Sequence, residues 1–112
     1  MKITYANQRV EKYFTDFAKM KKKLPSEWIR IIKKHLDRLE AAECFGDFLS
    51  LGLGHPERLS ETDVIRYSLR VTANVRLIIE LDAMDGNVRI CELVEVKGVN
   101  DYHGGKDNWY IS

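Results

Sequence analysis

Cysteine is scarce in this chain, and its scarcity excludes the class of small proteins built on disulfide bonds. Only Cys44 and Cys91 occur among 112 residues, and their separation fits none of the short spacings that hold a zinc ion. We therefore expect both thiols to be reduced and to behave as small hydrophobic side chains. The sequence predicts neither a metal nor a cofactor.

Long apolar runs are also missing, which argues against a membrane protein. No window approaches the roughly 18 apolar residues of a membrane-spanning helix. The first residues, Met-Lys-Ile-Thr-Tyr, are not followed by the apolar core of a secretion signal. We expect a cytoplasmic protein without a membrane partner.

The chain has no excess of charge of one sign. Its 18 basic and 17 acidic residues give a net charge of +1, which is no global sign of a polyanionic partner. The charges are nevertheless segregated, because residues 19–38 hold eight Lys or Arg against two acids, and residues 40–63 hold six acids against one Arg. We predict that the stretch around Lys21, Lys22 and Lys23 makes one face or end of the molecule basic; ordinary solvated helix surfaces are the alternative.

The first half of the sequence has helical periodicity. A length of 112 residues with 45% hydrophobic content fits one domain over residues 1–112. Residues 2–5 predict a short strand, and apolar spacing predicts a helix from Val10 toward Leu24 and a second helix over residues 25–46. On the second helix we expect His35 on the solvated face. Residues 44–63 lack a sustained period and predict a loop that can include a turn of helix.

The second half changes to a period of two. Alternating residues predict strands over 65–71 and 75–81 joined as a hairpin. The pair Asp85-Gly86 is a strong turn signal, and residues 88–96 supply a third strand. The sequence therefore predicts an α+β domain in which an N-terminal strand and two helices pack on an antiparallel sheet.

The register of this hairpin points to an anion. If its strands pair across a turn of three residues, Arg70 opposes Arg76 and Arg66 opposes Glu80, all on the face away from the helices. Opposed arginines repel each other unless an anion or a carboxylate lies over them. We interpret this face as a phosphate-binding surface; arginines that are simply solvated are the alternative.

Two segments carry side chains suited to proton transfer. His55 precedes a proline, which restricts the backbone that aims the imidazole, and Asp101-Tyr102-His103 follows a strand. Inert surface turns are the alternative for both. His55, Asp101 and His103 could also ligate a metal, although no local spacing of ligands supports this. Near the end of the sequence, Trp109 and Tyr110 could stack on bases, but docking on the core is the commoner role of such residues.

The joint order of these motifs resembles the HigB branch of the RelE/ParE superfamily of bacterial toxins. The segments that carry the resemblance are His55-Pro56 followed by Arg58, Tyr67-Ser68-Leu69-Arg70-Val71, Asn74-Val75-Arg76-Leu77-Ile78, and Asp101-Tyr102-His103. The resemblance implies a RelE-like toxin fold and a ribosome-dependent, metal-independent mRNA endonuclease that inhibits translation and growth. It also implies a cognate HigA-like DNA-binding antitoxin, with the ribosome and mRNA as the other partners.

The resemblance assigns roles to residues of this chain. Its implied catalytic set is His55 and His103 as acid and base, Arg70 and Arg76 on the phosphate, Asp101 as orienting group and Tyr102 on the nucleotide. The expected RNA- or ribosome-binding set is Lys21, Lys22, Lys23, Arg58, Arg66 and Lys106. The chain departs from the family in continuing past His103 and in its low net charge. A ParE-like inhibitor of DNA gyrase and a non-catalytic binding module on the same scaffold are the alternatives.

Overall fold

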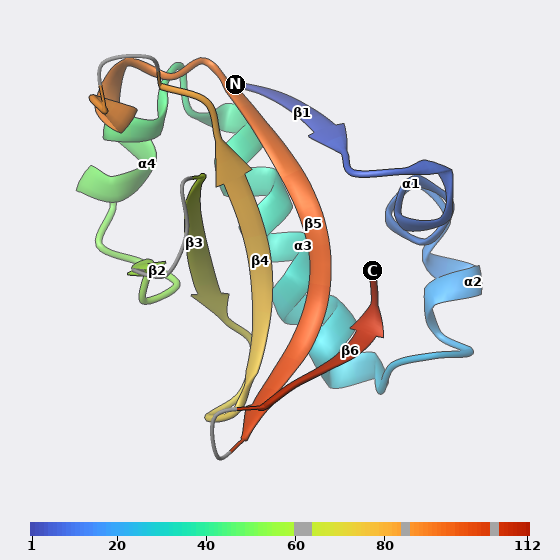
Figure 1. The fold of residues 1–112 in the computed structure, drawn as a ribbon. Coiled ribbons are helices and arrows are strands. Elements are labelled where there is room, and N and C mark those ends of the chain that lie inside the picture. Colours follow the sequence, from blue (N-terminus) through green and yellow to red (C-terminus); the bar gives the residue numbers. More distant parts are fainter. Residues whose placement is uncertain (60–63, 84–85, 104–105) are drawn as a thin grey trace.

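Six strands and four α-helices form the described part of the chain, so the expected α+β class is confirmed (Figure 1). The computed structural model describes residues 1–59, 64–83, 86–103 and 106–112, and of residues 102, 103, 106 and 107 the backbone alone. In chain order the elements are β1 (Lys2–Tyr5), α1 (Gln8–Phe14), α2 (Phe17–Met20), α3 (Ser26–Ala41), α4 (Phe45–Ser50), β2 (Glu57–Leu59), β3 (Ile65–Arg70), β4 (Val75–Leu81), the 3-10 helix η1 (Val88–Ile90), β5 (Leu93–His103) and β6 (Lys106–Ile111).

The sheet is mixed, where the sequence predicts an antiparallel one. Its strand order is β1-β5-β4-β3-β2, with β1 parallel to β5 and the other pairs antiparallel. Residues 93–96 of β5 pair with β1, and residues 99–103 of the same strand pair with β6. A parallel pair needs a long crossover between its strands. The helices that follow β1 supply it, and Figure 1 shows α3 crossing behind the sheet.

The first predicted helix is two short helices. Asn7 begins α1 by accepting a hydrogen bond from the backbone N–H of Val10 at 2.9 Å. Asp16 then begins α2 by accepting one from the N–H of Ala18 at 3.1 Å. A side chain that caps a new helix competes with continuation of the previous one. The apolar spacing alone does not reveal this break.

The second predicted helix ends earlier than expected, and another helix follows it. Ala42 has extended backbone angles (φ −71°, ψ 142°), so α3 stops at Ala41 and not at Gly46. The next segment forms α4, in which Phe45 and Phe48 are fully buried with ring centroids 5.6 Å apart. Six residues are too few to establish a helical period, which is why this segment reads as a loop.

The predicted hairpin is confirmed as β3 and β4. Its register pairs Arg66 with Glu80 and Arg70 with Arg76, as the three-residue turn predicts. The third strand differs, because residues 88–90 form η1 and β5 runs from Leu93 to His103. Gly86 has the positive φ (77°) expected of the predicted turn, and its neighbour Asp85 lies outside the described residues.

One hydrophobic cluster joins α3 and α4 to one face of the sheet. Its fully buried members are Val10, Met20, Ile32, Leu39, Phe45, Phe48, Leu69, Leu77, Ile79, Val94, Val96 and Val99. We call the other face, which looks away from α3, the open face. Within the described ranges, none of the helices has the length and apolarity required to cross a lipid bilayer.

Candidate phosphate-binding site

The turn between β3 and β4 fixes the two arginines opposite each other. The backbone N–H of Val71 donates to the carbonyl of Val75 at 2.9 Å, and the hydroxyl oxygen of Thr72 accepts from the N–H of Val75 at 3.1 Å. These bonds close the turn in one register. Arg70 and Arg76 therefore face each other on the open face, where like charges in register repel.

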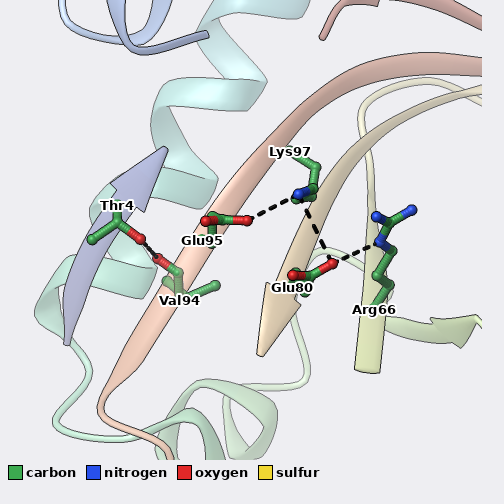
Figure 2. Close-up of polar contacts among 6 residues, drawn as sticks. All are labelled: Thr4, Arg66, Glu80, Val94, Glu95 and Lys97. Atoms are coloured by element: carbon green, nitrogen blue, oxygen red, sulfur yellow. Dashed lines mark hydrogen bonds and ion pairs between the residues drawn. The ribbon is translucent and has the colours of Figure 1, made fainter. Parts of the chain in front are cut away.

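Further along the open face, the charges neutralise each other. Figure 2 shows the Glu80 carboxylate between Arg66 Nε at 2.9 Å and Lys97 Nζ at 3.9 Å, and the same lysine 3.0 Å from Glu95 Oε2. Figure 2 also shows Thr4 of β1 beside the Val94 carbonyl of β5, at the parallel pair. Two acids and two bases alternate in this network, which leaves no net charge for an anion.

The two opposed arginines lie outside this network. Neither Arg70 nor Arg76 forms an ion pair with a residue in the described part of the chain. They line a pocket of about 250 Å³ together with His55, Pro56 and Glu57. Residues from the α4–β2 loop, β3 and β4 thus meet at one place, and a bound anion there would remove the repulsion.

The backbone before β2 holds His55 at the pocket in an uncommon conformation. His55 has φ of 47°, the left-handed region, and the following proline disfavours helical backbone at this position. Gly54 before it also has positive φ (81°), and its carbonyl accepts a hydrogen bond from the N–H of Arg70 at 2.9 Å. Holding a non-glycine residue in this region costs about 1–3 kcal/mol of conformational free energy. Residues strained in this way are commonest at functional sites.

Behind the pocket lies His35, which is buried, whereas the sequence predicts it on the solvated face of its helix. Only 2% of its surface is exposed. It occupies a position between Ile32, Leu36 and Leu39 on the apolar stripe of α3, so the helical period already places it on the core side. The prediction of a solvated His35 is wrong, because the position of the residue on this stripe decides its burial.

The His35 ring connects α3 to two parts of the pocket wall. Its Nε2 lies 2.7 Å from the Arg70 carbonyl oxygen, which can only accept, so Nε2 carries the proton and donates it. A Cβ placed on Gly54 would lie 2.9 Å from the ring Cε1, which shows how closely the loop backbone approaches the ring. His35 thereby supports the backbone of both Arg70 and Gly54, the residue that precedes His55.

Burial sets the protonation state of this histidine. It lowers the pKa of His35; the hydrogen bond to the Arg70 carbonyl opposes that shift, and the charge of Arg38 adds to it. The unprotonated Nδ1 is also buried, and it has no hydrogen-bond partner among the described residues. The neutral ring with its proton on Nε2 is therefore the form that the fold stabilises.

The structure does not bring Asp101 to the arginines. Asp101 pairs in register with Val75, which is buried in the core, so its carboxylate lies on the face opposite to the pocket. There its Oδ2 accepts a hydrogen bond from the Tyr110 hydroxyl at 3.2 Å.

Three other predicted site residues are described by their backbone only. Tyr102 and His103 continue β5 and pair with Asp107 and Lys106 of β6. The side chains of Tyr102, His103 and Lys106 lie outside the described part of the structure, so their predicted roles stay predictions.

The basic residues predicted to bind RNA are dispersed. Lys21, Lys22 and Lys23 are exposed after α2, which lies beyond the β1 edge of the sheet and far from β2 and β3 (Figure 1). Arg58 pairs with the buried Tyr67 and so projects away from the pocket face, and Arg66 is engaged by Glu80. The structure therefore separates the lysines from the arginine pocket.

Glu57 lines the pocket although no sequence motif marks it as a site residue. It pairs with Ser68 in β2–β3, which places it on the same face as Arg70. Because β2 has only three residues, no alternation of apolar and polar residues reveals its orientation.

The arrangement can bind an anion and move a proton. Two guanidinium groups can hold phosphate oxygens, while the imidazole of His55 and the carboxylate of Glu57 can exchange protons beside it. Among the described residues, no three His, Cys, Asp or Glu side chains gather closely enough to hold a metal ion. None of the family models, curated proteins or solved structures compared with this chain matches it.

Proposed function

We propose that this chain is a ribosome-dependent mRNA endonuclease, the toxin of a toxin–antitoxin pair with a RelE-like fold of the HigB type. The observation that carries the proposal is the pocket in which His55 meets Arg70 and Arg76. Each of these three residues belongs to a different motif of the sequence resemblance. Their convergence supports one site for phosphate binding and proton transfer.

The chemistry needs three events at one phosphodiester. The ribose 2′-OH loses a proton and its oxygen bonds to phosphorus, the phosphorane is stabilised, and the 5′-oxygen leaves with a proton. In the proposal Arg70 and Arg76 bind the phosphate oxygens. His55 and Glu57 stand beside them as groups that give or take a proton, and His103 is the second proposed histidine.

The partners follow from the same proposal. The ribosome positions the mRNA, so cleavage of free RNA is weak, and an antitoxin of the HigA type covers the arginine pocket or the basic helices. The exposed lysines after α2 offer a second basic surface for ribosomal RNA.

Mapping the 5′ ends of cellular mRNA after expression of the chain tests the proposal, with and without an inhibitor of translation. We expect new ends that depend on translation, together with arrest of growth. His55→Ala and His103→Ala should each reduce cleavage by about 10²–10⁴-fold while leaving ribosome binding intact, since each removes a proton-transfer group. Wild-type protein that neither arrests growth nor produces new ends would refute the proposal.

A non-catalytic anion-binding module is the second candidate, and the position of Asp101 favours it. The carboxylate expected to orient a catalytic group lies on the opposite face of the sheet, bonded to Tyr110. A binding module needs the arginines but no titratable group. Full growth arrest by His55→Ala and His103→Ala, combined with loss of arrest in Arg70→Ala, would select this candidate.

A further inference from the structure

A row of side chains crosses the open face from the pocket to the last strand. Arg70 pairs with Arg76, Arg76 pairs with Asn100, and Asn100 pairs with Trp109 of β6. Cross-strand partners project to the same face of a sheet. The row therefore runs from two guanidinium groups to an indole ring.

The side chain next to Trp109 lies on the core side of the sheet. Tyr110 packs edge-on against Trp28 of α3 with ring centroids 5.3 Å apart, and its hydroxyl bonds to Asp101 on the core side. The register of β6 shifts beside Tyr110, between the pairs Val99–Ile111 and Asn100–Trp109, so the face of Trp109 follows from its own pairing with Asn100 and Arg76. Trp109 is consequently on the open face, and 39% of its surface is exposed.

We propose that Trp109 is a stacking site for a base of single-stranded RNA whose phosphate is held by Arg70 and Arg76. This inference rests on the proposed function and adds to it the recognition of an unpaired base. Tyr110 already docks on the helical layer, so the core does not require a second aromatic side chain on the other face. An exposed indole beside guanidinium groups is the combination that binds single strands with little sequence preference.

The distances suit one strand of RNA. Two spacings between neighbouring strands of about 4.8 Å separate the backbone of Arg76 from that of Trp109, roughly 10 Å in all. The sugar and base of a nucleotide next to the bound phosphate can reach across this interval. The network of Arg66, Glu80 and Lys97 lies along the sheet on the same face and offers no competing positive charge.

Tryptophan fluorescence tests the stacking directly, because the chain has only two tryptophans. Trp28→Phe leaves Trp109 as the reporter, and Trp109→Phe leaves Trp28, which belongs to α3 on the core side of the sheet. The probes are a short single-stranded oligoribonucleotide and an abasic oligomer of the same length. We expect the oligoribonucleotide to quench Trp109 but not Trp28, and the abasic oligomer to quench neither.

Affinities measured with the same probes separate stacking from charge. Trp109→Ala should bind the oligoribonucleotide about 10-fold more weakly and the abasic oligomer unchanged, since stacking on one base is worth on the order of a 10-fold change in affinity. Trp109→Phe should recover most of the loss. Ile90→Ala, which trims a residue 64% exposed on η1, is the control and should bind both probes normally.

Two results would overturn the inference. Either Trp109→Ala binds the oligoribonucleotide as the wild type does, or it loses the same affinity for both oligomers. When either of these Trp109→Ala results occurs although Arg70→Ala weakens binding of both probes and ribosomal mRNA is cut, the stacking site fails while the proposed function stands. If Arg70→Ala changes neither affinity and no mRNA is cut, the proposed function fails and the stacking site fails with it.

Discussion

At the scale of single residues, His35 links the helical layer to the pocket. Its ring donates to the carbonyl of Arg70 and lies against Gly54, so one side chain of α3 supports two parts of the wall. Burial disfavours a charge on this ring, and the positive charge of Arg38 on the same helix disfavours it further. The fold therefore favours the neutral form.

The lowered pKa of His35 predicts a loss of stability in mild acid. The unfolded state binds the proton near the ordinary pKa of about 6.5, whereas the folded state resists it. The free energy of unfolding should thus fall as pH drops below that value. His35→Gln cannot titrate and keeps an N–H donor for the Arg70 carbonyl, so urea unfolding between about pH 5 and 8 should show a flatter pH dependence.

A second variant separates the hydrogen bond from the charge. His35→Leu fills the space but leaves the buried Arg70 carbonyl without its donor, which should lower the free energy of unfolding by about 1–3 kcal/mol at neutral pH. His35→Gln should recover most of this loss. Identical pH profiles for wild type and His35→Gln would show that another group controls the acid dependence.

Replacing Gly54 should disturb the pocket wall, and the same replacement at Gly52 is the control. Gly54→Ala places a Cβ 2.9 Å from the His35 ring at a φ of 81°, so we expect a loss above about 1–2 kcal/mol and weaker binding of the oligoribonucleotide. Gly52→Ala has a similar φ of 65° with nothing within 4 Å, and it should show the backbone penalty alone. Equal losses of stability and of RNA affinity in the two variants would contradict the proposed support of the pocket by Gly54 and His35.

At the level of secondary-structure elements, the pairing of Arg70 with Arg76 in the β3–β4 hairpin is predicted to reduce stability and to support RNA binding. Arg70→Glu would turn a repulsive cross-strand pair with Arg76 into an attractive one, which should stabilise the protein by about 0.2–1 kcal/mol. The same change should abolish binding of the oligoribonucleotide, because a carboxylate replaces a phosphate ligand. Thermal unfolding and binding titrations measure the two effects.

Arg66→Glu is the matched control on the same strand. It would place a carboxylate opposite Glu80 and destroy the ion pair at 2.9 Å, so it should destabilise the protein. Its effect on RNA affinity should be much smaller than that of Arg70→Glu. Loss of stability in Arg70→Glu would mean that the two guanidinium groups do not repel each other in solution.

At the scale of the whole molecule, positive charge is divided between two separate surfaces. One is the arginine pocket at the β2–β3–β4 side of the sheet, and the other is the exposed run of three lysines after α2 (Figure 1). Long-range attraction to ribosomal RNA needs charge but not the geometry of a site. The two surfaces can therefore be tested independently.

Reversal of the lysine run should weaken docking without affecting the pocket. Replacing Lys21, Lys22 and Lys23 together by Glu should lower ribosome affinity most at low salt, and the slope of affinity against salt should become shallower. Binding of a short oligoribonucleotide to the pocket should change little. Unchanged ribosome affinity at low salt would identify the run as an ordinary solvated surface.

Local sequence patterns predict the parts of the structure that depend on neighbouring residues in the chain. Alternation over residues 65–81 and a three-residue turn specified the hairpin and the opposition of Arg70 and Arg76. The apolar stripe specified most of α3, and its period already contained His35. Such features depend on residues close together in the chain, so the pattern of polar and apolar side chains is enough.

Tertiary packing selects which distant segments meet. Partners far away in the sequence determine four features of the structure: the parallel pairing of β1 with β5, the burial of α4, the position of Glu57 in the pocket and the contact of Asp101 with Tyr110. No local period records such a choice, because it is settled by burying the greatest apolar area with every strand paired. The site can therefore be predicted only in part from the sequence. The hairpin register places its two arginines, whereas tertiary packing brings the other lining residues to them.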